Sequence, residues 1–265
     1  MMDLGLHDKV VLVTGSTAGI GFAAATQFAR EGAEVIVHGR SLARVETAME
    51  LLREHVPNAR LRAAAGDLAT AEGAAEVIAS APMVDVLVNN VGIFEATAFE
   101  DITDSDWTRF FETNVMSGVR MARHYLPAML TRGWGRIQFI SSESGIMTPA
   151  EMVHYGLTKT AQLALVQGLA ARTTGTGVTV NAILPGPTRT EGVTTYLEGL
   201  AESLGMSVEQ TERDFFAKTR PTSLLQRFAE PEEIASMIVY SASARATATN
   251  AAGLRVDGGI IRGLI

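Results

Sequence analysis

The sequence contains no cysteine among its 265 residues. Disulfide bonds, thiolate nucleophiles and cysteine-ligated zinc are therefore excluded, and a reducing compartment suits the chain. No uninterrupted apolar run reaches membrane-spanning length, and Met1 to Lys9 lacks the apolar core of a signal peptide. No histidine cluster indicates a metal. We expect a cytoplasmic protein with no membrane contact and no metal site.

Basic residues are also scarce relative to acidic ones. The chain has 22 Lys and Arg against 29 Asp and Glu, which gives a net charge of −7. A field of this sign repels phosphate backbones, so no nucleic-acid partner is expected. Pro- and Ser-rich tracts are missing too, which leaves no linker, and the length suits one α/β domain spanning residues 1–265.

What the sequence does contain is a regular alternation of strand and helix patterns. Strands are predicted at 10–13, 34–38, 60–65, 83–88, 136–141, 178–184 and 254–256. Helices are predicted at 22–30, at 41–55, at 71–80, from a cap at Asp104 or Ser105 to an end or kink near Pro127, at 153–172, and from 231 onward. Right-handed crossovers between such strands give a Rossmann-type, doubly wound parallel sheet with helices on both faces. The strand pattern lapses at 191–229, just after a sheet end, where a substrate lid is expected.

The first predicted strand runs into a glycine-rich turn, Thr-Gly-Ser-Thr-Ala-Gly-Ile-Gly at residues 14–21, and then into a helix. Glycines at 15, 19 and 21 permit a sharp turn and a close approach of the backbone to a pyrophosphate. Amides at the helix N-terminus favour negative charge there. A turn shaped only by conformational needs is the alternative; the strand-to-helix context favours dinucleotide binding.

The end of the second strand bears on which dinucleotide is bound. An acidic residue there selects NAD, whereas this chain has Gly39 followed by Arg40. The guanidinium can stack on adenine and pair with a 2′-phosphate, which predicts NADP(H), with NAD(H) as the alternative. A solvated turn residue is the other interpretation of Arg40.

Tyr155 and Lys159 are four residues apart and so share one face of the predicted helix. A phenol near pKa 10 becomes an acid-base catalyst at pH 7 if its pKa falls by about 3 units, which requires roughly 4 kcal/mol. One ammonium about 4 Å away supplies roughly that amount at an effective dielectric near 20. Taken alone, the pair is more often a surface feature of a helix.

Other segments make the pair informative. Ile-Ser-Ser-Glu-Ser-Gly at 140–145, Asn-Asn-Val-Gly at 89–92, Thr-Asn-Val at 113–115 and Val-Asp-Gly-Gly at 256–259 accompany it. Together with the turn at 14–21, they resemble the compact branch of the short-chain dehydrogenase/reductase family over essentially the whole chain. Only the segment at 191–229 is loosely similar.

The resemblance implies hydride transfer between the nicotinamide and a small-molecule carbonyl or secondary alcohol. It implies that Tyr155 is the acid and base and that Ser142 binds the oxyanion. It also implies that Lys159 lowers the pKa of Tyr155 and holds the nicotinamide ribose hydroxyls, and that Asn114 positions a water leading from Lys159 to solvent. The implied cofactor-binding residues are Gly15, Ser16, Thr17, Gly19, Ile20, Gly21, Arg40, Asp67, Leu68, Asn90, Gly92, Tyr155, Lys159, Pro185, Gly186, Thr188 and Thr190. Relatives also suggest a homotetramer or homodimer, built on the helices that begin near Asp104 and Val153; core packing of these helices is the alternative.

Several residues stay ambiguous. His154 precedes Tyr155 and therefore points to another face of the helix, where it is expected to be solvent-exposed. Candidates for the wall of a substrate pocket are Glu143, Met147, Val153, Arg189, Tyr196, Phe215 and Phe216, although the aromatic ones can equally pack the 191–229 segment. The competing functions are an NAD-dependent alcohol dehydrogenase of the same family and a catalytically silent dinucleotide sensor. The complete set of four implied catalytic residues disfavours the sensor.

Overall fold

The computed structural model describes residues 3–263. The predicted domain ends, residues 1 and 265, lie outside the described residues. Within residues 3–263, no helix combines the length and the apolar character needed to cross a membrane.

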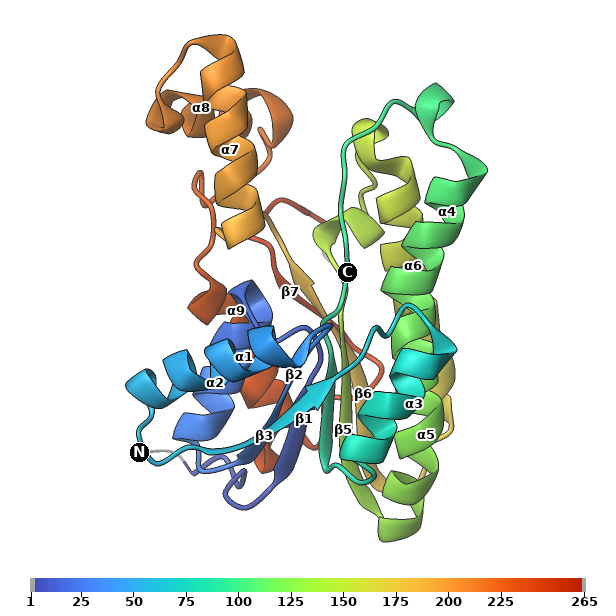
Figure 1. The fold of residues 1–265 in the computed structure, drawn as a ribbon. Helices are drawn as coiled ribbons and strands as arrows, with labels where there is room; N and C mark the ends of the chain where they lie inside the picture. Colours follow the sequence, from blue (N-terminus) through green and yellow to red (C-terminus); the bar gives the residue numbers. More distant parts are fainter. Residues whose placement is uncertain (1–2, 264–265) are drawn as a thin grey trace.

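Seven strands form one sheet in the order β3-β2-β1-β4-β5-β6-β7 (Figure 1). The strands are β1 (Val10–Val13), β2 (Glu34–Gly39), β3 (Arg60–Ala65), β4 (Val86–Asn89), β5 (Trp134–Ile140), β6 (Gly177–Pro185) and β7 (Gly253–Val256). All pairings are parallel. The strand order reverses between β1 and β4, which opens a ligand crevice at their carboxyl ends. The predicted Rossmann-type parallel sheet is confirmed.

Helices cover both faces of this sheet (Figure 1). They are α1 (Gly19–Arg30), α2 (Leu42–His55), α3 (Ala71–Ser80), α4 (Asp104–Phe111), α5 (Ser117–Arg132), α6 (Val153–Ala171), α7 (Glu191–Leu204), α8 (Val208–Asp214) and α9 (Pro231–Ala242). Successive side chains of β1 point to opposite faces of the sheet, and a hydrophobic core lies on each face. Val11 and Val13 pack with α1, α2 and α9, while Leu12 packs with α3, α5 and α6. Each such buried aliphatic side chain contributes about 1.5–3 kcal/mol.

The predicted cap of α4, Asp104 or Ser105, is wrong by one or two residues. Thr103 is the N-cap, and its hydroxyl accepts a hydrogen bond from the Asp106 amide at 3.2 Å. The Asp106 carboxylate in turn accepts one from the Thr103 amide, completing a capping box. The Thr103 hydroxyl and the Asp106 carboxylate therefore determine where α4 begins.

The prediction that this long helix ends near Pro127 is also wrong. Pro127 lies inside α5, which continues to Arg132 and ends at Gly133 with φ of +70°. Leu126 and Met129 on either side of the proline are buried against the sheet. Their packing holds the helix together across the one missing backbone hydrogen bond. The interruption occurs earlier, at a π-helical turn over Glu112–Met116.

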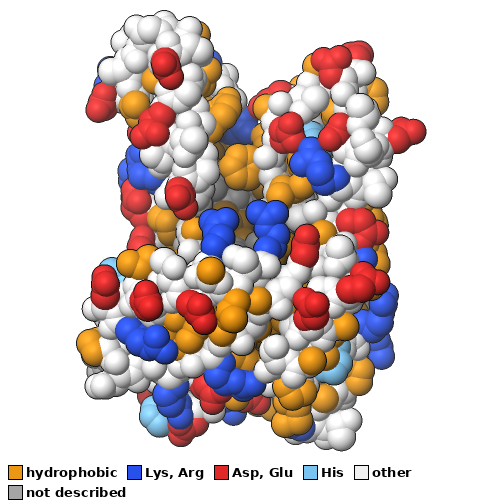
Figure 2. Space-filling model, in the orientation of Figure 1, with side chains coloured by type: hydrophobic (Ala, Val, Ile, Leu, Met, Phe, Trp, Pro, Cys, Tyr) orange, Lys and Arg blue, Asp and Glu red, His pale blue; other side chains and the backbone are white. Residues whose placement is uncertain are grey.

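The segment at 191–229 forms α7, α8 and a second π-helical turn, Phe215–Thr219. In Figure 1 these helices rise beyond the carboxyl edge of the sheet, opposite α4 and the start of α6. Leu197, Phe216 and Phe228 form a small hydrophobic cluster of their own within this segment. Figure 2 shows the surface hollowed between the two projections.

Candidate active site

The glycine-rich turn joins β1 to α1 with geometry that side chains do not permit. Gly15 and Gly19 have φ of +64° and +55°. A Cβ atom on Gly21 would lie 2.3 Å from the Gly15 carbonyl oxygen. The first turn of α1 has no acidic residue, and its N-cap Ala18 provides no side-chain hydrogen bond. The helix amides are thus left for an outside anion, which fits a dinucleotide pyrophosphate.

Asn90 fixes this turn from the neighbouring strand end. Its Nδ2 donates to the carbonyl oxygens of Thr14 at 3.0 Å and Gly15 at 3.1 Å. The Thr14 hydroxyl accepts from the Asn90 amide at 2.9 Å. Gly92, two residues on, leaves room for Lys159, because a Cβ there would lie 3.3 Å from Nζ.

Ser16, a predicted cofactor-binding residue, has a fully buried side chain. Its hydroxyl accepts a hydrogen bond from the His38 amide at 2.9 Å, so it braces β2 against the turn. No sequence motif marks His38, although a histidine near the end of an apolar strand indicates a polar contact at that strand end. The imidazole lies between the turn and the Gly66 carbonyl of the loop after β3.

A cavity of about 500 Å³ lies beside the turn, where the adenosine half of a dinucleotide would fit. Its wall includes Gly39, Arg40, Asp67 and Leu68, as the sequence suggests, and also Arg44. No sequence motif marks Arg44, yet its position on α2, four residues after Arg40, puts two guanidinium groups at one cavity. Asp67 is exposed, and its carboxylate accepts from the Ala69 amide at 3.0 Å.

A second cavity, of about 800 Å³, adjoins the first. Ser142 follows β5, and Tyr155 and Lys159 lie on α6; all three line this cavity. Lys159 Nζ lies 5.5 Å from the centroid of the Tyr155 ring and donates to the Ile140 carbonyl at 2.9 Å. Burial lowers the pKa of Lys159 to about 8. Burial, followed by the nearby Glu143 carboxylate, raises the pKa of Tyr155 above its ordinary value, so the phenol is protonated. The expected lowering of this pKa by Lys159 is therefore wrong for the protein without a dinucleotide, because burial outweighs it.

Asn114 lies beneath this group, in the π-helical turn Glu112–Met116. Its Oδ1 accepts from the Ile93 amide at 2.8 Å, and its Nδ2 donates to the Ile93 carbonyl and to Thr158 Oγ1, each at 3.0 Å. Its backbone carbonyl accepts from Gln162 Nε2 at 2.6 Å. Asn114 therefore connects the loop after β4 to α6.

The segment after β6 closes the cavity on the other side. A Cβ on Gly186 would lie 2.8 Å from the Asp257 carbonyl oxygen, so only glycine fits there. The hydroxyl of Thr188 donates to the Gly186 carbonyl at 2.9 Å, and Thr190 caps α7. Pro185, Gly186, Thr188 and Thr190 all line the cavity, as does Ile20 from α1.

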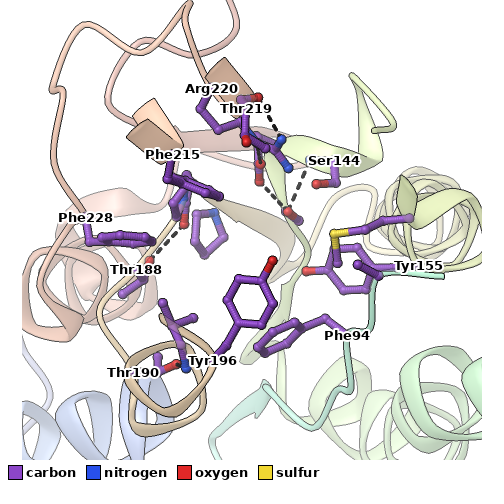
Figure 3. A pocket seen from close by; sticks show the side chains of 18 of the residues that line it. Phe94, Ser144, Tyr155, Thr188, Thr190, Tyr196, Phe215, Thr219, Arg220 and Phe228 are labelled. Atoms are coloured by element: carbon purple, nitrogen blue, oxygen red, sulfur yellow. Dashed lines mark hydrogen bonds and ion pairs between the residues drawn. The ribbon is translucent and has the colours of Figure 1, made fainter. Parts of the chain in front are cut away.

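Aromatic side chains form much of the remaining wall. Figure 3 shows Phe94, Tyr196, Phe215 and Phe228 around the cavity. Tyr155 lies beside Phe94, and Arg220 lies next to Thr219 at the top of the view. Of the ambiguous candidates, Glu143, Tyr196 and Phe215 line the cavity. The others, Met147, Val153, Arg189 and Phe216, are not among its lining residues.

Two of these residues have other partners. Phe216 is buried in the cluster with Leu197. Arg189 pairs with Glu212 at 2.8 Å and with Glu230 at 3.3 Å, which ties α8 to the start of α9.

The expected exposure of His154 is wrong. Only 1% of the residue is exposed, and its ring packs against Phe110 at 3.9 Å between centroids and against Trp107 at 6.0 Å. The helix face opposite Tyr155 is covered because α4 packs on it, a tertiary contact that helical periodicity does not report. Burial lowers the pKa of His154.

A glycine cradle at the switch point of a parallel sheet, next to a cavity with a buried Tyr-Lys pair, defines a dinucleotide-binding enzyme of Rossmann type. Residues 9–200 match the family described as short chain dehydrogenase. The chain belongs to this family of oxidoreductases, which act on alcohol and carbonyl groups with a nicotinamide dinucleotide. The resemblance predicted from the sequence is confirmed.

Individual relatives cover nearly the full chain. The uncharacterized oxidoreductase YvrD of Bacillus subtilis (strain 168) is 48% identical over 266 residues, spanning 99% of this chain and 100% of that protein. D-beta-hydroxybutyrate dehydrogenase of Cupriavidus necator is 31% identical over 258 residues, spanning 96% of this chain and 98% of that protein. The crystal structure of L-sorbose reductase from Gluconobacter frateurii, complexed with NADPH and L-sorbose, superposes with a TM-score of 0.92 at 32% identity, covering 99% of this chain and 100% of that one.

Proposed function

We propose that this protein is an NADP(H)-dependent carbonyl reductase, able to run in reverse as a secondary-alcohol dehydrogenase. The observation that carries the proposal is the meeting of Ser142, Tyr155 and Lys159 at one cavity that adjoins the glycine-rich turn. A dinucleotide-sensing protein has no use for this arrangement, whereas carbonyl reduction needs an oxyanion donor and a proton donor side by side.

Each of the four residues has a proposed role. Tyr155, held protonated by burial, donates the proton to the carbonyl oxygen during reduction. Ser142 donates a hydrogen bond to the same oxygen as negative charge develops on it. Lys159, with a pKa lowered to about 8 and its Nζ 5.5 Å from the centre of the Tyr155 ring, would hold the nicotinamide ribose hydroxyls. Asn114 holds the loop after β4 against α6, the helix that carries Tyr155 and Lys159.

The bound nicotinamide would supply the hydride to the carbonyl carbon. The residues proposed to hold the dinucleotide are the glycine-rich turn, Asn90, Gly92 and the segment from Pro185 to Thr190, with Asp67 and Leu68 at the adenine. Arg40 and Arg44 line the adenosine cavity next to Gly39, where a Cβ would lie 2.7 Å from Thr17 Cγ2. Two guanidinium groups, with no carboxylate at residue 39, favour the 2′-phosphate of NADP(H).

The segment at 191–229 is proposed to be the substrate lid of a single catalytic domain spanning residues 1–265. It supplies Tyr196, Phe215 and Arg220 to the cavity that Tyr155 also lines (Figure 3). We also propose a cytoplasmic homotetramer or homodimer, with a small-molecule carbonyl or alcohol as its partner.

The test is the initial rate of NADPH and NADH oxidation with a panel of ketones, aldehydes, keto sugars and 3-oxoacyl thioesters. Turnover that is lost in Tyr155→Phe, while NADPH still binds, is the expected result. Turnover retained by Tyr155→Phe would contradict the proposed acid. NADPH binding with no turnover on the whole panel would favour the dinucleotide sensor.

A further inference from the structure

The hydroxyl of Ser142 points its proton at a neighbouring carboxylate. Ser142 Oγ donates to Glu143 Oε2 at 2.5 Å and accepts from the Ser144 amide at 3.1 Å. A serine hydroxyl has one proton. While that proton is given to Glu143, it is not available to a carbonyl oxygen in the cavity.

Glu143 has little else to bind. Its side chain is 6% exposed and lines the same cavity. The nearest cation is Arg220, whose Nε lies 3.6 Å from Oε1, beyond hydrogen-bond length. Arg220 is shared with Glu151, which lies 3.5 Å from its Nη1. Oε2 of Glu143 thus has Ser142 as its hydrogen-bond donor, and a buried carboxylate oxygen that loses its donor is costly.

Carbonyl reduction requires the Ser142 proton to turn toward the reacting oxygen. A second donor must then replace it at Glu143 Oε2. Arg220 faces the other carboxylate oxygen and is already shared, so the replacement has to come from whatever occupies the cavity.

We infer that Glu143 is a specificity-determining residue that selects α-hydroxyketones, and that the substrate hydroxyl donates to Glu143 Oε2 while the adjacent carbonyl accepts from Ser142. This inference rests on the proposed reductase function. Oxygens on adjacent carbon atoms lie about one hydrogen-bond length apart, which matches the 2.5 Å between Ser142 Oγ and Glu143 Oε2. Addition of one hydride and one proton across the carbonyl then gives a vicinal diol, with the reduced nicotinamide as the hydride source.

The chemistry of Glu143 argues for a neutral hydroxyl over an anionic group. A carboxylate on the substrate has no proton to donate to Glu143 Oε2, whereas a hydroxyl has one. The charged side chains that line the cavity balance, with Glu143, Glu151 and Asp214 against Lys159, Lys218 and Arg220, so a neutral substrate leaves no charge uncompensated. Phe94, Tyr196 and Phe215 on the remaining wall suit the carbon skeleton (Figure 3).

The test uses three ketones: 1-hydroxy-2-butanone; 3-pentanone, which has a methyl group in place of the hydroxyl; and 1-methoxy-2-butanone, which accepts but does not donate at that position. A hydrogen bond to a charged group contributes about 1.5–3 kcal/mol, so kcat/KM for the hydroxyketone should exceed the other two by about 10- to 150-fold. In Glu143→Ala this ratio should fall below about 3-fold, and in Glu143→Gln it should be intermediate, because a neutral acceptor remains.

Glu209→Gln is the matched control, since it removes one negative charge from an exposed position on α8 that does not line the cavity; its ratio should stay at the wild-type value. Thermal melting of each variant separates loss of selectivity from loss of folding. Similar kcat/KM on all three ketones, or a ratio that survives Glu143→Ala, overturns the inference. So does silence on all three when other carbonyls of the panel are reduced. The proposed function fails by a different result, retained turnover in Tyr155→Phe or no turnover on the entire panel.

Discussion

The amide of Gly15 donates a hydrogen bond of 2.9 Å to Nδ1 of His38. This contact requires Nδ1 to be unprotonated, so the proton of the neutral ring is on Nε2, which donates to the Gly66 carbonyl at 3.1 Å. One neutral imidazole therefore holds the glycine-rich turn between two strand ends. A charged ring would lose the bond from Gly15.

The stability of the protein is expected to depend on pH through His38. Burial lowers its pKa from 6.5 to about 4 in the folded state. Because the folded-state pKa is below the unfolded one, the contribution is complete above pH 6.5 and is lost as the pH falls toward 4. The difference of about 2.5 units corresponds to roughly 3 kcal/mol. Urea unfolding at intervals between pH 7 and pH 4 measures it.

The control for that experiment is His38→Asn, which keeps an acceptor for Gly15 and does not titrate. This variant should be less stable than the wild type at pH 7, and its stability should decline less between pH 6.5 and 4. Parallel curves for the two proteins would show that another group carries the pH dependence.

Gly21→Ala should weaken dinucleotide binding. The added Cβ would lie 2.3 Å from the Gly15 carbonyl and 2.6 Å from Asn90 Nδ2, so the turn must open. Overpacking of this kind costs about 1–3 kcal/mol, which predicts a loss of roughly 5- to 150-fold in NADPH affinity by calorimetry. Gly199→Ala provides the comparison, since it lies within α7 with open space at the Cβ position. That change should stabilise the protein by about 0.5–1 kcal/mol and leave the NADPH affinity intact. Equal NADPH affinities in Gly21→Ala and Gly199→Ala would refute the role of the turn.

Arg40→Ala should lower the preference for NADPH over NADH about 10-fold or more, and Arg40→Ala with Arg44→Ala should lower it further. Each guanidinium is expected to give a charge-assisted hydrogen bond to the 2′-phosphate, which NADH lacks. The measurement is kcat/KM for both dinucleotides at one fixed carbonyl. Arg53→Ala, also on α2 but outside the cavity, makes the same change in net charge and should leave the ratio alone. An unchanged ratio in the double variant would assign NADP(H) preference elsewhere.

Asn114→Ala is expected to destabilise the fold by about 2–4 kcal/mol. The change removes three hydrogen bonds and leaves the Ile93 amide and carbonyl without their side-chain partner. Thr158→Val removes one of these bonds and should cost about 1 kcal/mol. Urea midpoints for the two variants give the comparison. Equal losses would mean that Asn114 does not hold the loop after β4.

Much of the fold was predictable because the signals for it are local. The alternation of apolar strands with amphipathic helices predicted the parallel sheet, and the strand limits differ from the structure by only a few residues. The spacing between Tyr155 and Lys159 put both side chains on one helix face without any knowledge of the fold. Boundaries set by a single side chain, such as the cap at Thr103, were less accessible because several neighbouring residues have a suitable oxygen.

Other features were not predictable from the sequence, because they depend on contacts between distant segments. The π-helical turn at Glu112–Met116 puts Asn114 against Ile93 and Thr158, which are 21 and 44 residues away along the chain. Burial of His154 follows from the packing of α4 on α6, which overrides the helical periodicity.

The sequence by itself determined the class of sheet, the glycine-rich turn and the oxidoreductase family, since each is encoded in local patterns and motifs. Only the tertiary structure decided what those residues face. It brought Arg44 to the same cavity as Arg40, Arg220 to within 3.6 Å of Glu143, and the proton of Ser142 to a carboxylate. The direction of a hydrogen bond and the burial of a charge depend on every segment that packs around them, and that packing exists only in the folded chain.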